Sequence, residues 1–155
     1  MSVKKLIDTY QLQPHPEGGY FRETYRSPED VASPVHGQQR AVVTQIYFLL
    51  GRDDISRFHK VFHDEIWHFY DGAPLRLIDL HEQGASEIIL GGNSGRYHHV
   101  ISGGHYQAAE STGDYSLVGG TVAPGFDFAD FKFLSDDGQS MQSLEPHYRP
   151  YRRFI

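Results

Sequence analysis

The chain of 155 residues contains no cysteine. This absence excludes disulfide bonds, thiolate zinc sites and a cysteine nucleophile, and it is typical of proteins that work in a reducing cytoplasm. Long apolar runs are absent as well: none approaches the ~20 residues of a transmembrane helix, and the start "MSVKKLIDTY" lacks the hydrophobic stretch of a signal peptide. We therefore expect a cytoplasmic protein with no membrane partner.

Positive charge is scarce. Lysine and arginine together number 14 against 20 aspartates and glutamates, which gives a formal net charge of −6. The only dense basic run is the short "YRPYRRFI" at the end of the chain. Binding to a phosphate backbone needs a concentrated cationic surface, so nucleic acid is not an expected partner.

The chain is rich in three other residue types: 14% of its residues are aromatic, and it has 16 glycines and ten histidines. Ser2 can cap an opening helix in which Leu6, Ile7 and Tyr10 share one face. A second short helix is expected at "DDGQSMQSLEP", ending before Pro146. About nine strand-like runs lie between them, separated by turns and not by helices. These runs are "YFRETYRS", "AVVTQIYFLL", "SRFHKVF", "EIWHFYDG", "LRLIDLH", "SEIILGG", "YHHVISGGHYQAAE", "YSLVGGTVAP" and "FADFKFLS".

This arrangement predicts an all-β fold, an antiparallel barrel or sandwich with a short helix at each end. No internal repeat, low-complexity segment or change of composition marks a boundary, so residues 1–155 are expected to form a single domain.

The stretch "SRFHKVFHDEIWHFYDG", residues 56–72, resembles the first motif of the cupins, the double-stranded β-helix superfamily. That motif has a glycine, two histidines one residue apart, a glutamate three or four residues on, and a glycine after six more. Gly51, His59, Glu65 and Gly72 stand at four of these places. "GGTVAPGFDFADF" resembles the second motif, with Pro124 in place. The whole chain is similar to a cupin subfamily described mainly as a domain of unknown function, which implies a jelly-roll barrel and a homodimer.

Two of the four metal ligands that the resemblance implies are missing. The second histidine falls on Val61 and the third on Ala129, neither of which can bind a metal. A stable transition-metal site normally uses at least three protein ligands, so no metal or other cofactor is expected. If a metal does bind, His59 and Glu65 would hold it. The neighbours that could replace the missing ligands are His63, Asp127 and Asp130.

Strand alternation predicts which side chains face the inside of such a barrel. The residues expected to face the lumen are Arg57, His59, Glu65, Trp67 and Phe69. Those expected to close its mouth are Tyr20 or Phe21, Arg22, and Phe126 or Phe128. Aromatic walls with a few convergent polar groups are typical of a site for a small organic ligand.

The expected chemistry centres on a His59–Glu65 pair, in which the glutamate orients the histidine as a base. Cupin epimerases use a histidine base with a carboxylate partner, so the resemblance implies metal-independent isomerisation or epimerisation of a sugar or nucleotide derivative. The alternatives are a non-catalytic ligand-binding module and a metal-dependent oxygenase or lyase. Either residue can also have a purely structural role, with His59 satisfied by a neighbouring acceptor.

The segment "HPEGGYFRETYRS" is expected to bend sharply at its glycine pair and to continue as a strand. Alternation would place Arg22 and Arg26 on one face and Glu23 and Tyr25 on the other. An arginine at the barrel mouth can clamp a phosphate or carboxylate. The alternative is an edge strand that completes the sheet of a dimer.

Overall fold

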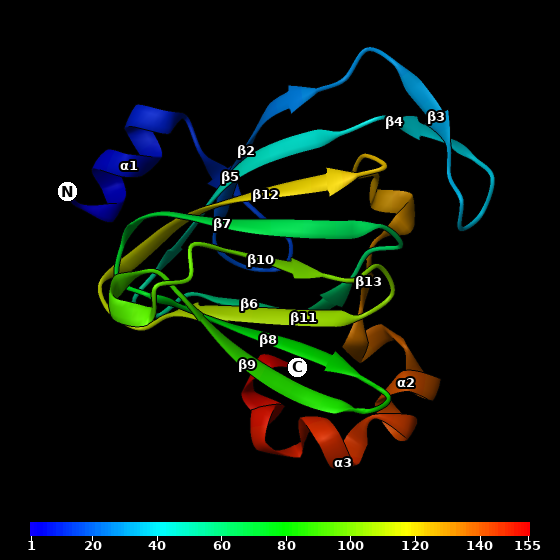
Figure 1. Ribbon diagram of the computed structural model, residues 1–155. Coiled ribbons are helices and arrows are strands. Elements are labelled where there is room, and N and C mark those ends of the chain that lie inside the picture. Colours follow the sequence, from blue (N-terminus) through cyan, green and yellow to red (C-terminus); the bar gives the residue numbers. More distant parts are fainter.

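The computed structural model describes residues 1–155 and contains two antiparallel sheets that face each other, with helices at both ends of the chain (Figure 1). The predicted all-β class and the two terminal helical regions are confirmed. Helix α1 spans Val3–Tyr10, and the C-terminal helices α2 and α3 span Gly138–Ser143 and Glu145–Tyr148. None of the helices has the length and hydrophobicity needed to cross a bilayer.

The larger sheet has six strands in the order β1-β2-β5-β12-β7-β10. Their bounds are Gln13–Pro14 (β1), Tyr20–Arg26 (β2), Thr44–Gly51 (β5), Tyr115–Ala123 (β12), Asp64–Gly72 (β7) and His98–Ile101 (β10). A separate hairpin of β3 (Asp30–Ala32) and β4 (Gln39–Ala41) extends beyond one end of this sheet (Figure 1).

The smaller sheet has five strands in the order β13-β6-β11-β8-β9. Their bounds are Lys132–Phe133 (β13), Ile55–Lys60 (β6), Tyr106–Ser111 (β11), Leu75–His81 (β8) and Gly84–Leu90 (β9). The segment that follows β12 descends one end of the barrel and enters this second sheet as β13, so it links the two sheets (Figure 1).

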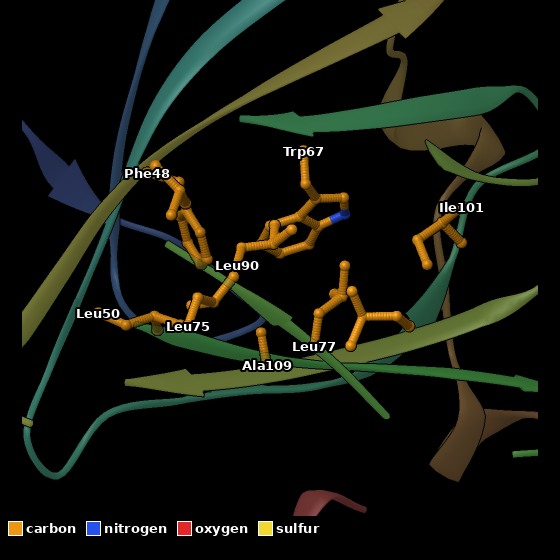
Figure 2. Close-up of a cluster of buried hydrophobic side chains, with 10 residues drawn as sticks. Phe48, Leu50, Trp67, Leu75, Leu77, Leu90, Ile101 and Ala109 are labelled. Carbon is orange, nitrogen blue, oxygen red and sulfur yellow. The ribbon is translucent and has the colours of Figure 1, made fainter. Parts of the chain in front are cut away.

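The space between the sheets is filled over part of its length by an apolar core. Ten buried side chains form it, with Trp67 from β7 packed against Phe48 from β5 and the aliphatic residues of β8 (Figure 2). Neighbouring residues in the same strands face the opposite way, as period-two alternation requires. Leu49 and Leu117 thus pack outward against Leu6 of α1.

The C-terminal helices cover the outer face of the five-stranded sheet (Figure 1). Ile78 and Leu80 of β8 are fully buried there, against Leu144, Tyr148 and Phe154. The five-stranded sheet is therefore packed on both faces, by the core inside the barrel and by the helices outside it.

Three local predictions need correction. The run "YHHVISGGHYQAAE" forms two strands, β10 and β11, because Gly104 turns with a positive φ of 87°. "FADFKFLS" contains only the two-residue β13, flanked by the 3-10 turns Phe128–Asp130 and Leu134–Asp136. Helical structure continues past Pro146, since proline is tolerated in the first turn of α3, and a 3-10 segment over Arg149–Phe154 follows.

Candidate functional site

One end of the barrel interior is hollow, with a cavity of about 300 Å³. Strands β2, β5, β6, β7 and β12 provide its walls, and the segment after β12 covers it. The lining residues are His15, Glu17, Phe21, Glu23, Arg26, Thr44, Ile46, His59, Val61, Glu65, Gly120, Val122, Phe126, Asp127, Phe128 and Phe131.

His59 on β6 is 2% exposed and uses both ring nitrogens within the protein. Nδ1 donates to the carbonyl oxygen of Arg57 at 2.7 Å, and Nε2 lies 2.6 Å from Oε2 of Glu17. Burial would lower the pKa of His59, but the Glu17 carboxylate outweighs it and holds this pKa above the ordinary value. His59 is therefore a buried imidazolium that is paired with Glu17.

Glu17 is 5% exposed and is the acidic half of this pair. Burial would raise the pKa of Glu17, but the facing imidazolium of His59 holds it below its ordinary value. The two buried charges therefore stabilise each other, and removal of either partner leaves the other charge without this partner.

Glu65 at the start of β7 is the second buried carboxyl group of the cavity. Its Oε1 accepts from Nε2 of Gln107 at 2.7 Å, and Oε1 of Gln107 accepts from Nε1 of Trp67 at 2.6 Å. Burial and the nearby Glu17 carboxylate raise the pKa of Glu65 to about 7. Glu65 is thus a carboxyl group that exchanges its proton near neutral pH.

His15 is neutral. Its Nδ1 accepts from the backbone N–H of Glu17 at 3.1 Å, which leaves Nε2 as the ring N–H. Burial lowers its pKa. The ring lies edge-on to Phe21, with centroids 4.5 Å apart, and near Phe128 and Phe131. The cavity therefore combines a neutral imidazole donor with an aromatic wall.

Charged groups at the rim are paired among themselves. Arg26 donates to both carboxylate oxygens of Glu23, at 2.8 and 2.9 Å, and to the carbonyl oxygen of Phe126 at 3.0 Å. The expected faces of β2 are wrong: a register shift against β5 breaks the alternation, so Glu23 and Arg26 both line the cavity. Arg22 does not.

The residues expected at the cavity mouth divide into two groups. The structure places Phe21, Phe126 and Phe128 in the cavity wall. Of the alternatives Tyr20 and Phe21, it is therefore Phe21 that lies there, and Tyr20 lies outside. Arg22 also lies outside, so its expected position at the mouth is wrong. Because Phe21 faces inward, its neighbours on β2 face outward: Tyr20 packs beside α1, and Arg22 donates to the carbonyl oxygen of Tyr10.

The residues expected to face the lumen also divide. His59 and Glu65 line the cavity, whereas Trp67 and Phe69 face the interior but belong to the packed core. The expected lumen position of Arg57 is wrong: a β-bulge places Ser56 opposite Ala109 and His59 opposite Gln107 and interrupts the alternation. The guanidinium of Arg57 instead stacks on Phe133, 4.3 Å from the ring centroid.

The expected His59–Glu65 pairing is also corrected, because Glu17 takes the place of Glu65 as the partner of His59. Sequence reasoning missed Glu17 and His15. The signal was present in "HPEGG": Gly18 has φ 114°, and a Cβ there would lie 1.8 Å from the carbonyl oxygen of Ile55. Only glycine permits that approach, and it holds Glu17 against β6.

The cavity residues do not fit a metal centre of the kind that cupin motifs imply. Val61 fills one ligand position with an aliphatic side chain, and Ala129 lies in a 3-10 turn and is not among the lining residues. The ionisable groups of the cavity do not bring three ligand atoms within 4.8 Å of one another. His63 and Asp130 lie elsewhere, in a cluster with His36 and Arg40.

Comparisons with known proteins agree with the fold. A family model described as the cupin superfamily (DUF985) matches residues 4–134. An uncharacterized protein of Saccharomyces cerevisiae is 32% identical, over 94% of this chain and 81% of the yeast protein. A hypothetical protein from Leishmania major superposes with a TM-score of 0.90 at 26% identity, over 100% of this chain and 99% of that one.

Two further structures extend the comparison. A protein of Shewanella oneidensis has a TM-score of 0.86 at 28% identity, over 100% of this chain and 97% of that one. Oxalate decarboxylase of Bacillus subtilis has a TM-score of 0.61 at 14% identity, over 79% of this chain and 30% of that enzyme. The last likeness concerns the fold alone.

Proposed function

The chain belongs to the cupin superfamily (DUF985), and from this premise we propose that its cavity binds a small neutral organic molecule and transfers a proton on it without a metal. The reaction class is isomerisation or epimerisation of a sugar-sized carbonyl compound. The observation that carries the proposal is Glu65, a cavity carboxyl group with a pKa of about 7. A general base works best when its pKa lies near the working pH.

Glu65 has one oxygen available for this role. Gln107 occupies Oε1, whereas Oε2 lies beside Gly120 in the cavity wall, where an added Cβ would approach it to 2.6 Å. In the proposed step, the ionised form of Glu65 takes a proton from the carbon next to a carbonyl group, and an enolate forms. In an α-hydroxy carbonyl compound, the hydroxyl proton passes to the carbonyl oxygen and Glu65 returns the first proton to the former carbonyl carbon, so the carbonyl group moves by one carbon. Epimerisation instead requires the enolate to turn over before Glu65 returns the proton, so that the carboxyl group meets its opposite face.

His15 and His59 have different parts in this proposal. The N–H at Nε2 of His15 is the donor for the carbonyl oxygen on which negative charge develops. His59 does not act as the base, since both of its nitrogens already donate within the protein. Its pairing with Glu17 keeps a carboxylate near Glu65, which supports the raised pKa of Glu65.

The size and charge of the cavity support a small, uncharged ligand. About 300 Å³ lies at the lower end of the usual range of ligand sites, so a monosaccharide or a single aromatic ring fits better than a nucleotide sugar. Glu17 is paired with His59, and Glu23 with the one lining arginine, Arg26, so no cation of the lining is free and Asp127 adds negative charge. Phosphate-bearing ligands are therefore disfavoured.

A non-catalytic binding module is the second candidate. The contacts of His59 with Arg57 and Glu17 favour this candidate, because they make the base expected from the sequence unavailable to a ligand. This candidate predicts saturable binding without any proton exchange on the ligand, and Glu65 would then only receive a hydrogen bond from it.

The test uses thermal-shift screening of neutral sugars and hydroxyketones to find ligands, since a ligand that binds the folded state raises Tm. Each ligand found is then incubated in D₂O with the wild type and with Glu65→Gln, and carbon-bound deuterium is measured by NMR. Deuterium incorporation by the wild type that Glu65→Gln abolishes, with ligand binding retained, supports proton transfer. Binding without incorporation in both proteins supports the binding module and overturns the catalytic proposal.

We also propose a homodimer in the cytoplasm, as the family resemblance implies. The short β1 pairs with Tyr20 and Phe21 alone, so the rest of β2 presents an unpaired edge on which a second copy can add. Light scattering after size-exclusion chromatography measures the mass, and a monomer of 17.7 kDa would contradict this part of the proposal.

A further inference from the structure

Two histidines and an aspartate gather at the end of β8 and the start of β11, outside the cavity. The register pairs Tyr106 with Leu80, and one more step brings His105 opposite His81. Asp79 lies two residues before His81 and therefore on the same face of the sheet. Two residues at i and i+2 on one strand and a third across the ladder form a compact three-sided cluster.

Short contacts already join the members of this cluster. Nδ1 of His105 lies 2.8 Å from Oδ1 of Asp79. Nδ1 of His81 lies 2.8 Å from Oε1 of Gln83 and 3.3 Å from the backbone nitrogen of Gln83. A neutral imidazole keeps one nitrogen with a free lone pair, and a metal ion that replaces the proton between His105 and Asp79 is bound by both residues.

We propose that Asp79, His81 and His105 form a binding site for a divalent transition-metal ion such as Zn²⁺. One potential ligand atom from each residue lies within 4.8 Å of the others. Ligands bound to one zinc ion at ~2.0–2.2 Å lie about 3–3.5 Å apart, so small side-chain rotations are enough to close the set. Two imidazoles with one carboxylate prefer zinc, nickel or copper over magnesium or calcium.

The site is accessible to solvent. The side chains of His105 and Asp79 are 30% and 16% exposed, and His81 and His105 line a cleft of about 340 Å³. The imidazole rings of His81 and His105 stack, with centroids 4.4 Å apart and 23° between their planes. The two rings are therefore close together, and rotation of the side chains must direct one nitrogen of each toward the ion. Three protein ligands with an open side leave coordination positions for water or another molecule.

A second cluster, His36, His63 and Asp130, has the same residue types but lacks this capacity. There the guanidinium of Arg40 donates to both carboxylate oxygens of Asp130, at 2.9 and 2.8 Å. An arginine already occupies the place of a cation, so this cluster serves as the matched control.

The experiment titrates metal-free, untagged protein with Zn²⁺ by calorimetry and with Co²⁺ by visible absorption. We expect one equivalent to bind, His81→Ala and His105→Ala each to lower the affinity by at least about tenfold, and His36→Ala to leave it unchanged. Circular dichroism checks that each variant folds, and Asp79→Asn, which keeps the side-chain shape, is expected to weaken binding as well.

Three results would overturn the proposal. The first is the absence of saturable binding at metal concentrations up to about 100 μM, a hundred times a micromolar Kd. The second is binding that survives the His81→Ala/His105→Ala double substitution, and the third is binding that is lost in His36→Ala. None of these results bears on proton exchange at Glu65, because the cluster shares no residue with the cavity.

Discussion

The two halves of the barrel interior come from the same strands, yet one is solid and the other hollow. On β5, Thr44 and Ile46 line the cavity, whereas Phe48 lies in the core. On β12 the corresponding residues are Val122 in the cavity and Val118 in the core. One set of strands thus provides a packed half that stabilises the fold and a polar half that is available for a ligand.

The boundary between the halves is a hydrogen-bonded chain from Trp67 through Gln107 to Glu65. Trp67 fills the core, and its N–H is satisfied by the amide oxygen of Gln107, as a buried indole requires. The amide nitrogen of Gln107 then holds Glu65 in the cavity wall. Packing in the solid half therefore determines the geometry of the hollow half.

Replacement of Trp67 by alanine is expected to have the largest effect on stability, because it breaks the hydrogen-bonded chain between the two halves. The variant loses the largest side chain of the core and leaves Oε1 of Gln107 without its donor, so we expect the free energy of unfolding to fall by about 5 kcal/mol. Urea denaturation followed by circular dichroism measures the change. A loss below about 1 kcal/mol would show that Trp67 does not join the two halves.

Glu17→Gln affects the polar half alone. It leaves the buried His59 without its anion, and we expect a loss of about 4 kcal/mol. The raised pKa of His59 stabilises the fold below pH 6.5, and that contribution is lost as pH rises through the raised value. The lowered pKa of Glu17 stabilises it above pH 4.5, and that contribution is lost as pH falls through the lowered value.

The difference in stability between wild type and Glu17→Gln should therefore be largest between pH 4.5 and 6.5. Denaturation curves recorded across this range measure it, with His36→Ala as the control for loss of an unrelated histidine interaction. A difference that does not vary with pH would contradict a charged His59–Glu17 pair.

Glu65→Gln tests the second buried carboxyl group of the polar half, whose raised pKa makes stability fall as pH rises. The folded protein raises the pKa of Glu65 from 4.5 to about 7, so it binds more protons than the unfolded chain between these values, and stability falls as pH rises. At about 1.4 kcal/mol per pKa unit, the wild type should lose about 3 kcal/mol across this window relative to Glu65→Gln. Parallel stability curves for the two proteins would contradict the raised pKa.

Arg52→Ala, outside both halves of the interior, is expected to have the smallest effect on stability. Arg52 pairs with Asp114 on the surface, where the two side chains are 67% and 80% exposed. Exposed pairs contribute little because water and salt screen them, so the expected loss is under about 0.5 kcal/mol. Denaturation in low and high salt checks this, and a loss above about 1 kcal/mol would mean that the surface pair matters as much as a buried contact.

Much of the fold could be predicted because alternation in single strands is local. The apolar runs around Leu49 and Leu77 predicted strands, and the motif around Glu65 indicated the cupin family. Strict alternation failed at two register shifts, one on β2 near Glu23 and one on β6 near Arg57. A bulge depends on the pairing with the next strand, which periodicity within one segment cannot show.

The amino-acid sequence by itself determined the all-β class, the cupin family, and the inward-facing side chains of His59 and Glu65 on their strands. Only the tertiary structure decided that His59 pairs with Glu17, which is 42 positions earlier in the chain. It also decided that Glu65 accepts from Gln107 and has a raised pKa. The physical reason is that burial and Coulomb interactions depend on distances across the barrel. Those distances exist only once the two sheets have closed around the site.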